Sequence, residues 1–444
     1  MDDKKILLNA FEQTLERTRS LLDTLTVQQR NVPYHQGINP PVWELGHSAF
    51  FYEVFILRAL DHNPPLMPGF DNIWDSFDID HEDRWIPGLI PSRETTMSYM
   101  AAVYELIRNR IDRKPLTPKD LYLYKYAIFH QNMHIESLIW CRQTLGYPKP
   151  DFSQNSAVEY RFETSAGDTE IPGGAYHIGM PAEHKDFAME HFAFDNEKPG
   201  FIHHLEPFRI SKTLVSNQQY QEFVEDKGYE REDLWSWGGK KWLQTRLNSP
   251  LQVQGADIKV SHPVYWKKQE GRWWEKHFDQ WLPLEPDYPV RHVSYWEAEA
   301  WCQWAGRRLP TEFEWEAAAL DNREAPAFRR YPWGNIMDET NVDMDATQLA
   351  RLPVYALNTS PSPFGCIQMI GTVWEWTSSQ FLPYNGFSVD MYPFMSTLQF
   401  GYHKVTRGGS CATSSSLIRG TYRQAYLPHR NDVFVGFRTC ARES

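Results

Sequence analysis

The chain has 444 residues and a formal net charge of −12, with 41% hydrophobic and 23% charged residues. That length exceeds one ordinary hydrophobic core and predicts two domains, or three. The negative balance, without any Lys/Arg cluster, argues against a nucleic-acid partner, because phosphate binding needs a basic surface. No stretch reaches the ~20 apolar residues of a membrane-spanning helix, so no membrane partner is expected.

The N-terminal segment and the cysteines indicate the compartment. The start, MDDKKILLNAFEQTLERTRSLL, lacks the long apolar core and the small-residue cleavage site of a signal peptide. The five cysteines are an odd number, widely scattered and without a CxxC pair. This pattern argues against a disulfide framework or a cysteine-based zinc site. We therefore expect a cytoplasmic protein with reduced thiols.

Residues 1–150 have the periodicity of helices. Apolar residues recur at helix spacing from Leu7 to Leu22, and a second helix is expected after the NPP sequence at 39–41. A connection rich in Pro, Asp and Trp follows over 61–91. A third helix is expected over about 92–112 and a fourth over about 117–145, ending at Gly146. Four helices of this length predict a bundle.

The composition changes after residue 147. The sequence YPKPDFSQNSAVEY (147–160) has the character of a linker, and Gly, Pro and Trp then punctuate short strands. Helices are expected over 216–226 and 295–305. In RLPTEFEWE, Thr311 followed three residues later by Glu314 predicts a capped helix. Residues 151–444 are thus expected to form a loop-rich α+β domain.

Two histidines lie four residues apart in FHQNMHIESLIW (129–140). His130 and His134 would share one face of the fourth helix, where two imidazoles can bind one ion. The pair alone is more often a packed core pair. His47, in the apolar run of the second helix, offers a third imidazole, and bundles commonly build metal sites from facing helices. We therefore predict a site suited to zinc or iron(II), with positions open to substrate and dioxygen.

Two acids lie close to these histidines in the sequence. Glu136, two residues after His134, should point to another face, so it is a supporting or structural group rather than a ligand. Glu44, three residues before His47, either orients a ligand or is a solvated acid at the start of the helix.

Both halves resemble known families. The phrases IPGGAYHIGM (171–180), YPWGN (331–335), GTVWEWTSSQF (371–381), TRGGSCAT (406–413) and VFVGFRTC (433–440) resemble the formylglycine-generating-enzyme (sulfatase-modifying-factor) domain, over nearly all of 160–444. This resemblance implies an irregular, C-type-lectin-like α+β fold. The N-terminal half, with its GH on the second helix and His-x3-His on the fourth, resembles a DinB-type four-helix bundle.

The combination of the two is similar to the iron-dependent synthases of ergothioneine, ovothiol and selenoneine biosynthesis. The resemblance implies Fe(II) bound by His47, His130 and His134. It also implies hercynine (trimethylhistidine) as acceptor, with a sulfur or selenium donor joined to the imidazole carbon using O2. An unactivated imidazole C–H needs an oxidant, which open iron sites generate from O2.

Several positions depart from the sulfoxide synthases of this family that use γ-glutamylcysteine. Phe381 stands where those enzymes carry a tyrosine, so that acid is missing, although Tyr384 remains three residues on. Met133 replaces a glutamine that would touch the imidazole. These three positions are expected to line the substrate site.

The stretch RQAYLPHRND (423–432) departs as well. Gln424 stands in place of an Asn and Tyr426 in place of an Asp, while Arg430 is retained. A tryptophan of the family is also absent here, so the trimethylammonium group needs another aromatic face. Tyr426 and Trp374 are the candidates for that face, and Trp374 fits a core position equally well.

These departures, with DSFDIDHEDRW (75–85) and the ending LPHRNDVFVGFRTCA, resemble selenoneine synthases, which use a selenosugar donor. We expect that donor first and cysteine or γ-glutamylcysteine as the alternative. Arg84 and Arg93, near the connection, could reach the donor or be solvated loop charges. A remote alternative is a zinc-dependent DinB-type thiol transferase, which would use the same histidines without O2.

Overall fold

The computed structural model describes residues 3–152, 167–181, 192–248, 260–323, 329–390, 392 and 396–442. The chain divides into two compact units. Unit 1 comprises Met1–Ser153 and Glu183–Phe192, and unit 2 comprises Gln154–Ala182 and Ala193–Ser444. Most of the linker predicted over 147–160 lies outside the described residues.

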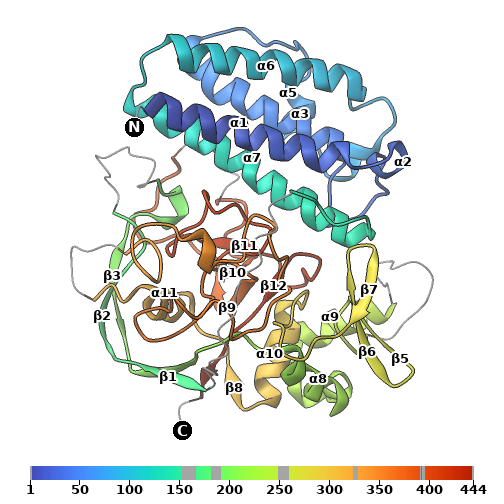
Figure 1. Cartoon of the computed structure of the whole chain (residues 1–444), viewed down its shortest axis with the longest axis vertical. Helices are drawn as coiled ribbons and strands as arrows, with labels where there is room; N and C mark the ends of the chain where they lie inside the picture. The colour runs from blue at the N-terminus through green and yellow to red at the C-terminus, as the bar shows by residue number, and fades with distance from the viewer. Residues whose placement is uncertain are drawn as a thin grey trace. The chain divides into compact units, whose positions relative to one another are not determined.

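Unit 1 is a bundle of four long helices, as the sequence predicts (Figure 1). The helices are α1 (Asp3–Asp23), α3 (Pro41–Tyr52), α6 (Arg93–Arg113) and α7 (Pro118–Leu145). α3 packs against α6 and α7, and α1 packs against the same two helices. α7 buries side chains all round its circumference, from Leu123 to Gln143, as expected of a helix enclosed by its neighbours.

Local sequence fixes the ends of these helices. Pro41 is the first residue of α3, where its missing N–H costs no hydrogen bond. α7 begins with a capping box between Thr117 and Asp120. It ends at Gly146, whose φ of 67° is the left-handed conformation of a helix C-cap.

The second predicted helix does not continue as a single α-helix. After Tyr52 it widens into a π-helical turn, η1 (Glu53–Arg58), and finishes as α4 (Ala59–Asp61). Such π-helical turns inside helices occur often at functional sites. Short helices that the sequence did not predict occupy the connections: α2 (Val27–Arg30), α5 (Asp71–Trp74) and the 3₁₀ turn η2 (Glu82–Trp85).

Unit 2 is an α+β domain whose described residues form four small sheets. One sheet has the order β1-β4-β13-β8 (Asp168–Ile171, Phe208–Ser211, Cys440–Ala441, Arg307–Arg308). A second has the order β11-β10-β9-β12 (Gln424–Tyr426, Lys404–Arg407, Trp374–Gln380, Val435–Gly436), in which only β9 and β12 are parallel. The others are the pair β2-β3 (Gly174–Ile178, Phe201–Leu205) and the meander β5-β6-β7 (Trp266–Gln269, Arg272–His277, Gln280–Pro283).

The α-helices of unit 2 are α8 (Asn217–Glu225), α9 (Trp237–Asn248), α10 (Tyr295–Trp304) and α11 (Glu312–Leu320). 3₁₀ turns lie at η4 (Asp195–Glu197), η5 (Gly228–Glu230), η6 (Glu232–Leu234) and η7 (Glu339–Asn341). The capping box of Thr311 and Glu314 is present at α11, as predicted. α9 was not predicted, because two glycines near its start weaken the helical pattern.

Buried ion pairs hold the family motifs of unit 2 together. Arg438 of GFR donates to Glu375 of WEW at 2.6 and 2.9 Å, and the Trp315 indole donates to the same carboxylate. Arg423 pairs with Glu312 in the same way. Losing one partner of such a pair would leave a buried charge uncompensated. Much of the motif set is therefore architectural.

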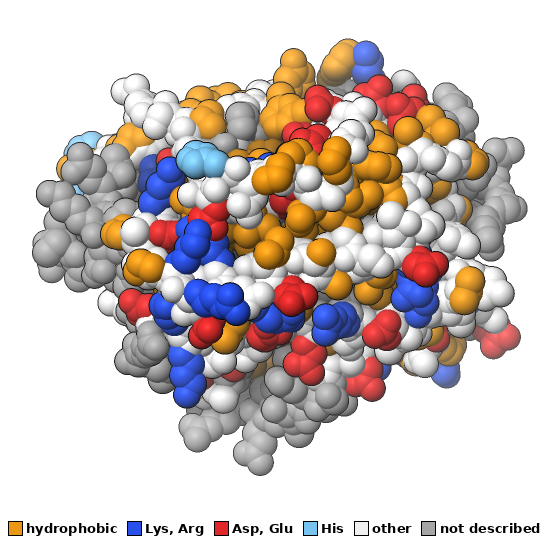
Figure 2. Space-filling view, turned by 90° about the horizontal axis from the view of Figure 1, so that it is seen from above, with side chains coloured by type: hydrophobic (Ala, Val, Ile, Leu, Met, Phe, Trp, Pro, Cys, Tyr) orange, Lys and Arg blue, Asp and Glu red, His pale blue; other side chains and the backbone are white. Residues whose placement is uncertain are grey.

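The surface charges and the free thiols agree with what the composition predicts. On the face shown in Figure 2, acidic and basic side chains are interspersed and do not form one basic field. Among the described residues, no helix has the length and apolarity to cross a membrane. All five cysteines are free and buried, and burial raises the thiol pKa of Cys141, Cys302, Cys366 and Cys440.

Candidate metal centre

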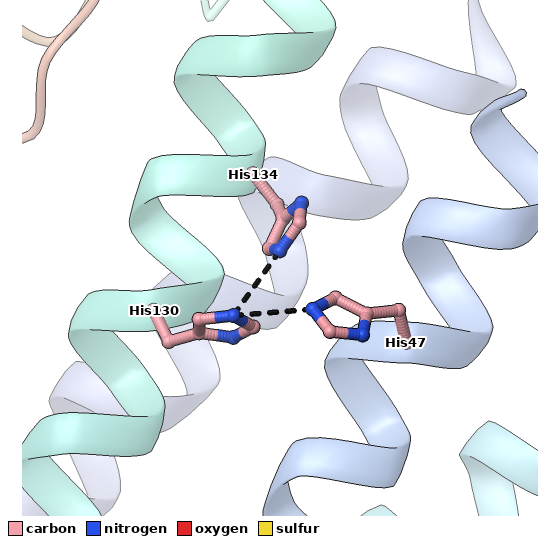
Figure 3. Close-up of side chains that lie close together, drawn as sticks. All are labelled: His47, His130 and His134. Carbon is pink, nitrogen blue, oxygen red and sulfur yellow. Dashed lines mark hydrogen bonds between the residues drawn. The ribbon is translucent and has the colours of Figure 1, made fainter. Parts of the chain in front are cut away.

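Three histidines of unit 1 turn their Nε2 atoms toward one another (Figure 3). His47 comes from α3, and His130 and His134 lie one turn apart on α7. The Nε2 atom of His130 is 3.2 Å from that of His47 and 3.3 Å from that of His134. Two imidazole nitrogens, each about 2.1 Å from a shared ion, would have separations of this size.

The protonation state of these imidazoles suits a cation. Nδ1 of His47 lies 2.6 Å from the carbonyl oxygen of Trp74, so it carries the ring proton and leaves a lone pair on Nε2. Burial, and next the neighbouring His134, hold the pKa of His47 well below its ordinary value. The pKa of His130 is lowered by the same two causes in the same order. His47 and His130 are thus held in the neutral form, in which an imidazole can ligate a metal ion.

Gly46 and Trp74 together orient His47. A Cβ at Gly46 would collide with the Trp74 ring, so the glycine lets this ring pack directly on α3. The ring position fixes α5, and the carbonyl at the end of α5 then meets His47. This explains the glycine of the GH pair in structural terms.

An aromatic and a cation cover the other side of His47. The Trp43 ring stacks on the imidazole with centroids 4.7 Å apart and planes 9° apart. The guanidinium of Arg84 lies 3.7 Å from the centroid of Trp43 and donates to Asn39 Oδ1 at 2.6 Å. Arg84 is thus held beside the histidine cluster by the stacked ring.

The carboxylate of Glu44, on α3, lies close to His134 of α7. It is 2% exposed, and its Oε2 lies 3.5 Å from Nδ1 of His134. Its Oε1 accepts from Ser137 Oγ at 2.6 Å and from Asn39 Nδ2 at 3.0 Å. A buried carboxylate beside a ligating imidazole orients the ring and strengthens its donor nitrogen. Glu136 is also buried, on α7.

The π-helical turn anchors the connection that carries Trp74. Glu53 is buried and accepts from Arg58, from the backbone N–H of Leu66 and from the hydroxyl of Tyr99. Arg58 in turn donates two hydrogen bonds to Asp71, the first residue of α5. An aromatic ring also packs on the histidine cluster: Phe51 stacks on His130 with ring centroids 3.9 Å apart.

The remaining predicted residues of unit 1 divide between two places. Met133 is half-buried on α7 between the two histidines. Arg93 lies elsewhere, at the first turn of α6, where it borders a cavity that the three histidines do not line. The structure thus places Arg84 beside the histidine cluster and Arg93 at this cavity, and a role of either residue in donor binding stays a prediction.

The predicted substrate residues of unit 2 gather at the β11-β10-β9 edge. Phe381 is buried against Val405 and Ala425. Tyr384 lies under the guanidinium of Arg423, 4.1 Å from its ring centroid. The Tyr384 hydroxyl has no hydrogen-bond partner among the described residues, and burial holds the pKa of this phenol well above its ordinary value.

Gln424, Tyr426 and Arg430 follow on β11 and the next turn. The Gln424 side chain accepts from the N–H of Ala425, and Arg430 pairs with Asp432 at 2.6 Å while lying 5.7 Å from the Tyr426 ring centroid. Trp374 is fully buried in β9 beside the Tyr422 ring.

Sequence reasoning missed Trp43, Trp74, Asn39 and Ser137. Trp43 and Ser137 each carried a usable signal, because they stand four residues before His47 and three after His134, which places them on the same helix faces. Trp74 and Asn39 lie in connections and gave none.

Comparisons with known proteins support the family predicted for each half of the chain. The model of the sulfatase-modifying factor enzyme 1-like domain matches residues 155–443, and that of the DinB superfamily matches residues 10–139. A hercynine oxygenase of Mycolicibacterium smegmatis is 30% identical over 442 residues, covering 97% of each chain. Its namesake in Mycolicibacterium thermoresistibile is 31% identical, over 95% of this chain and 91% of that one. That of Mycobacterium tuberculosis is 32% identical, over 91% of both.

These matches confirm the family that the motifs predict, at the level of hercynine oxygenases. The selenoneine branch within it stays a prediction. The chain therefore belongs to the hercynine oxygenase family and is an oxygen-dependent enzyme, built from a DinB-superfamily helical bundle and a sulfatase-modifying-factor-like α+β domain.

Proposed function

We propose that the chain is an iron(II)- and O2-dependent synthase that joins the sulfur of a thiol donor to the imidazole carbon of hercynine. The observation that carries this proposal is that the Nε2 atoms of three histidines meet in the helical bundle of this chain, which is similar to hercynine oxygenases over nearly its full length. Family membership favours this ergothioneine-pathway reading over the selenosugar donor that the sequence motifs suggested first.

His47, His130 and His134 would hold the iron. Three neutral nitrogen ligands without a cysteine suit iron(II) and leave further positions for other molecules. Bound there, iron would activate O2 and place the two substrates side by side. The chain's own residues hold the rings: Trp74 keeps the proton of His47 on Nδ1, and Glu44 faces Nδ1 of His134.

Tyr384 is our candidate for the group that supplies a proton. Like any phenol it is protonated at neutral pH, burial raises its pKa further, and its hydroxyl has no hydrogen-bond partner among the described residues, which is the feature that favours it. A buried, unpaired O–H is a donor ready to act. Phe381, at a position where the family resemblance implies a tyrosine, offers no proton and lies in an apolar cluster.

A selenosugar donor is the second candidate. Met133 and Tyr426 favour it, because a thioether beside the ligands and a phenol in place of an acid suit a donor without an ammonium group. Gln424, Arg430 and Arg84 are proposed to contact the substrates, with Tyr426 or Trp374 facing the trimethylammonium group.

The test is a single-turnover reaction with the full chain. The protein is loaded with Fe(II) under anaerobic conditions and mixed with hercynine and cysteine, γ-glutamylcysteine or a selenosugar, after which O2 is added. Mass spectrometry should detect a hercynine–sulfur adduct that forms only with O2. His130→Ala should abolish it, whereas His204→Ala, a change at an exposed histidine of unit 2, should not.

The other outcomes separate the alternatives. Efficient product formation with the selenosugar alone would establish the second candidate. Thiol transfer by the zinc-loaded protein without O2 would support the DinB-type transferase instead. An iron-loaded protein that makes no adduct with any of these donors would refute the proposal.

A further inference from the structure

A cavity of about 190 Å³ opens between α1 and α6 in unit 1, lined in part by Leu45 of α3 and Gln131 of α7. Leucine, methionine and tyrosine side chains form the apolar part of its walls, with Leu22 and Met100 buried, and polar or charged side chains form the rest. The three histidines do not line it, and the proposed reaction does not use it.

Gln131 gives this cavity a buried polar group. The side chain is 1% exposed, and its Nε2 donates to Thr18 Oγ1 at 3.0 Å and to the hydroxyl of Tyr104, another lining residue, at 3.4 Å. The Thr18 hydroxyl already donates to the carbonyl of Thr14 at 2.8 Å, so it can only accept from Gln131. In this orientation of the amide, Gln131 Oε1 has no hydrogen-bond partner among the described residues. A buried acceptor of this kind is costly unless a donor reaches it.

The mouth of the cavity carries a net positive charge. Its exposed charged lining residues, which we take to mark the mouth, are Arg19 and Arg93 with one carboxylate, that of Asp23. Arg93 is also the first residue of α6, a 21-residue helix whose N-terminal end favours anions. An anionic group at the mouth would meet two guanidinium groups and the helix end.

We propose that this cavity binds a small aromatic carboxylate. The ring would lie between the leucine and methionine walls, the carboxylate would contact Arg19 and Arg93, and a hydroxyl or N–H at the far end of the ring would donate to Gln131 Oε1. An apolar cavity of about 150 Å³ can hold benzene, so one substituted ring fits this volume. Met97 and Met100 favour an aromatic ring, because thioether sulfur contacts ring edges well.

Matched probes test each part of the proposal on the full chain. The reference is 4-hydroxyphenylacetate, measured by calorimetry and by methyl NMR with labelled Leu and Met. We expect shifts at Leu45, Met97 and Met100. Replacing the phenol by a methyl group, in 4-methylphenylacetate, should weaken binding about five- to tenfold. Tyramine, with an ammonium in place of the carboxylate, should bind at least about tenfold more weakly.

Two kinds of variant complete the test. Arg19→Glu combined with Arg93→Glu changes only exposed side chains and should weaken binding about tenfold. Met97→Trp, at a half-exposed position, should block the cavity, whereas Leu106→Trp on an exposed part of the same helix should bind normally. Equal affinity for the three probes, tighter binding of tyramine, no binding at millimolar probe, or full binding after the double charge reversal would overturn the proposal.

Discussion

Replacing Glu44 by glutamine removes one negative charge beside the histidine cluster and keeps the size of the side chain. Glu44 Oε2 lies 3.5 Å from His134 Nδ1, and Ser137 and Asn39 hold the other oxygen. When His134 binds a cation through Nε2, its Nδ1 must carry a proton, which the carboxylate can accept as a hydrogen bond. The amide of glutamine is a weaker acceptor and cannot balance the added positive charge.

The geometry sets the size of the expected effect. A hydrogen bond to a charged group contributes about 1.5–3 kcal/mol, and partners of ligating histidines typically change metal affinity about 10–100-fold. Because 3.5 Å is long for such a bond, we expect the lower end of this range, about tenfold or ~1.4 kcal/mol.

The assay is an anaerobic titration with Co(II), read from its visible absorption and from competition with a chelator. Asn39→Ala is the matched control, because Asn39 contacts the other oxygen of Glu44, and it should weaken binding no more than about threefold. Urea unfolding of the metal-free proteins would show that both variants are folded. A Glu44→Gln protein that binds Co(II) within twofold of the wild type would refute the reasoning, as would an equal loss in Asn39→Ala.

Three further predictions concern the same fold. His47→Ala should abolish stoichiometric Fe(II) binding, measured by metal analysis after desalting, and a variant that keeps its iron would show that the ion lies elsewhere. Gly46→Ala should lower the free energy of unfolding by about 1–3 kcal/mol in urea, because its methyl group collides with Trp74; an unchanged midpoint would contradict this packing. His292 is fully buried, and burial lowers its pKa to about 3, so the native ring stays neutral while the unfolded ring gains a proton below about pH 6.5. The free energy of unfolding should therefore fall by ~2 kcal/mol between neutral pH and pH 5 because of this residue. The His292→Phe protein should lose less stability over the same range. Equal pH slopes of the two proteins in urea unfolding would argue against this assignment.

Much of unit 1 was predictable because its signals are local. The fourth helix was expected over about 117–145 and runs over Pro118–Leu145, since a capping threonine and a terminal glycine mark its ends. The i, i+4 spacing of His130 and His134 requires both rings to lie on one face of that helix. His47 could be added because it lies in the apolar run of a neighbouring helix.

The supporting groups could not be predicted for a physical reason. Trp74 acts through its backbone carbonyl, which has no signature in the residue type, and it lies in a connection without periodicity. The approach of Glu44 to His134 depends on how α3 and α7 pack, 90 residues apart in the sequence. The buried carboxylate of Glu53 likewise has partners that only the folded chain brings together, from the π-helical turn itself, the connection after it and α6.

The burial of all five cysteines bears on how the protein withstands its own chemistry. If the proposed thiol donor is correct, the reaction mixes a free thiol with O2, which produces disulfides and other oxidants as by-products, and these attack thiolates on protein surfaces. With its sulfur atoms enclosed and the pKa raised for four of them, the chain offers no accessible thiolate to these reagents. The native protein should accordingly resist iodoacetamide and glutathionylation, which makes it suited to long turnover in an aerated, thiol-rich solution.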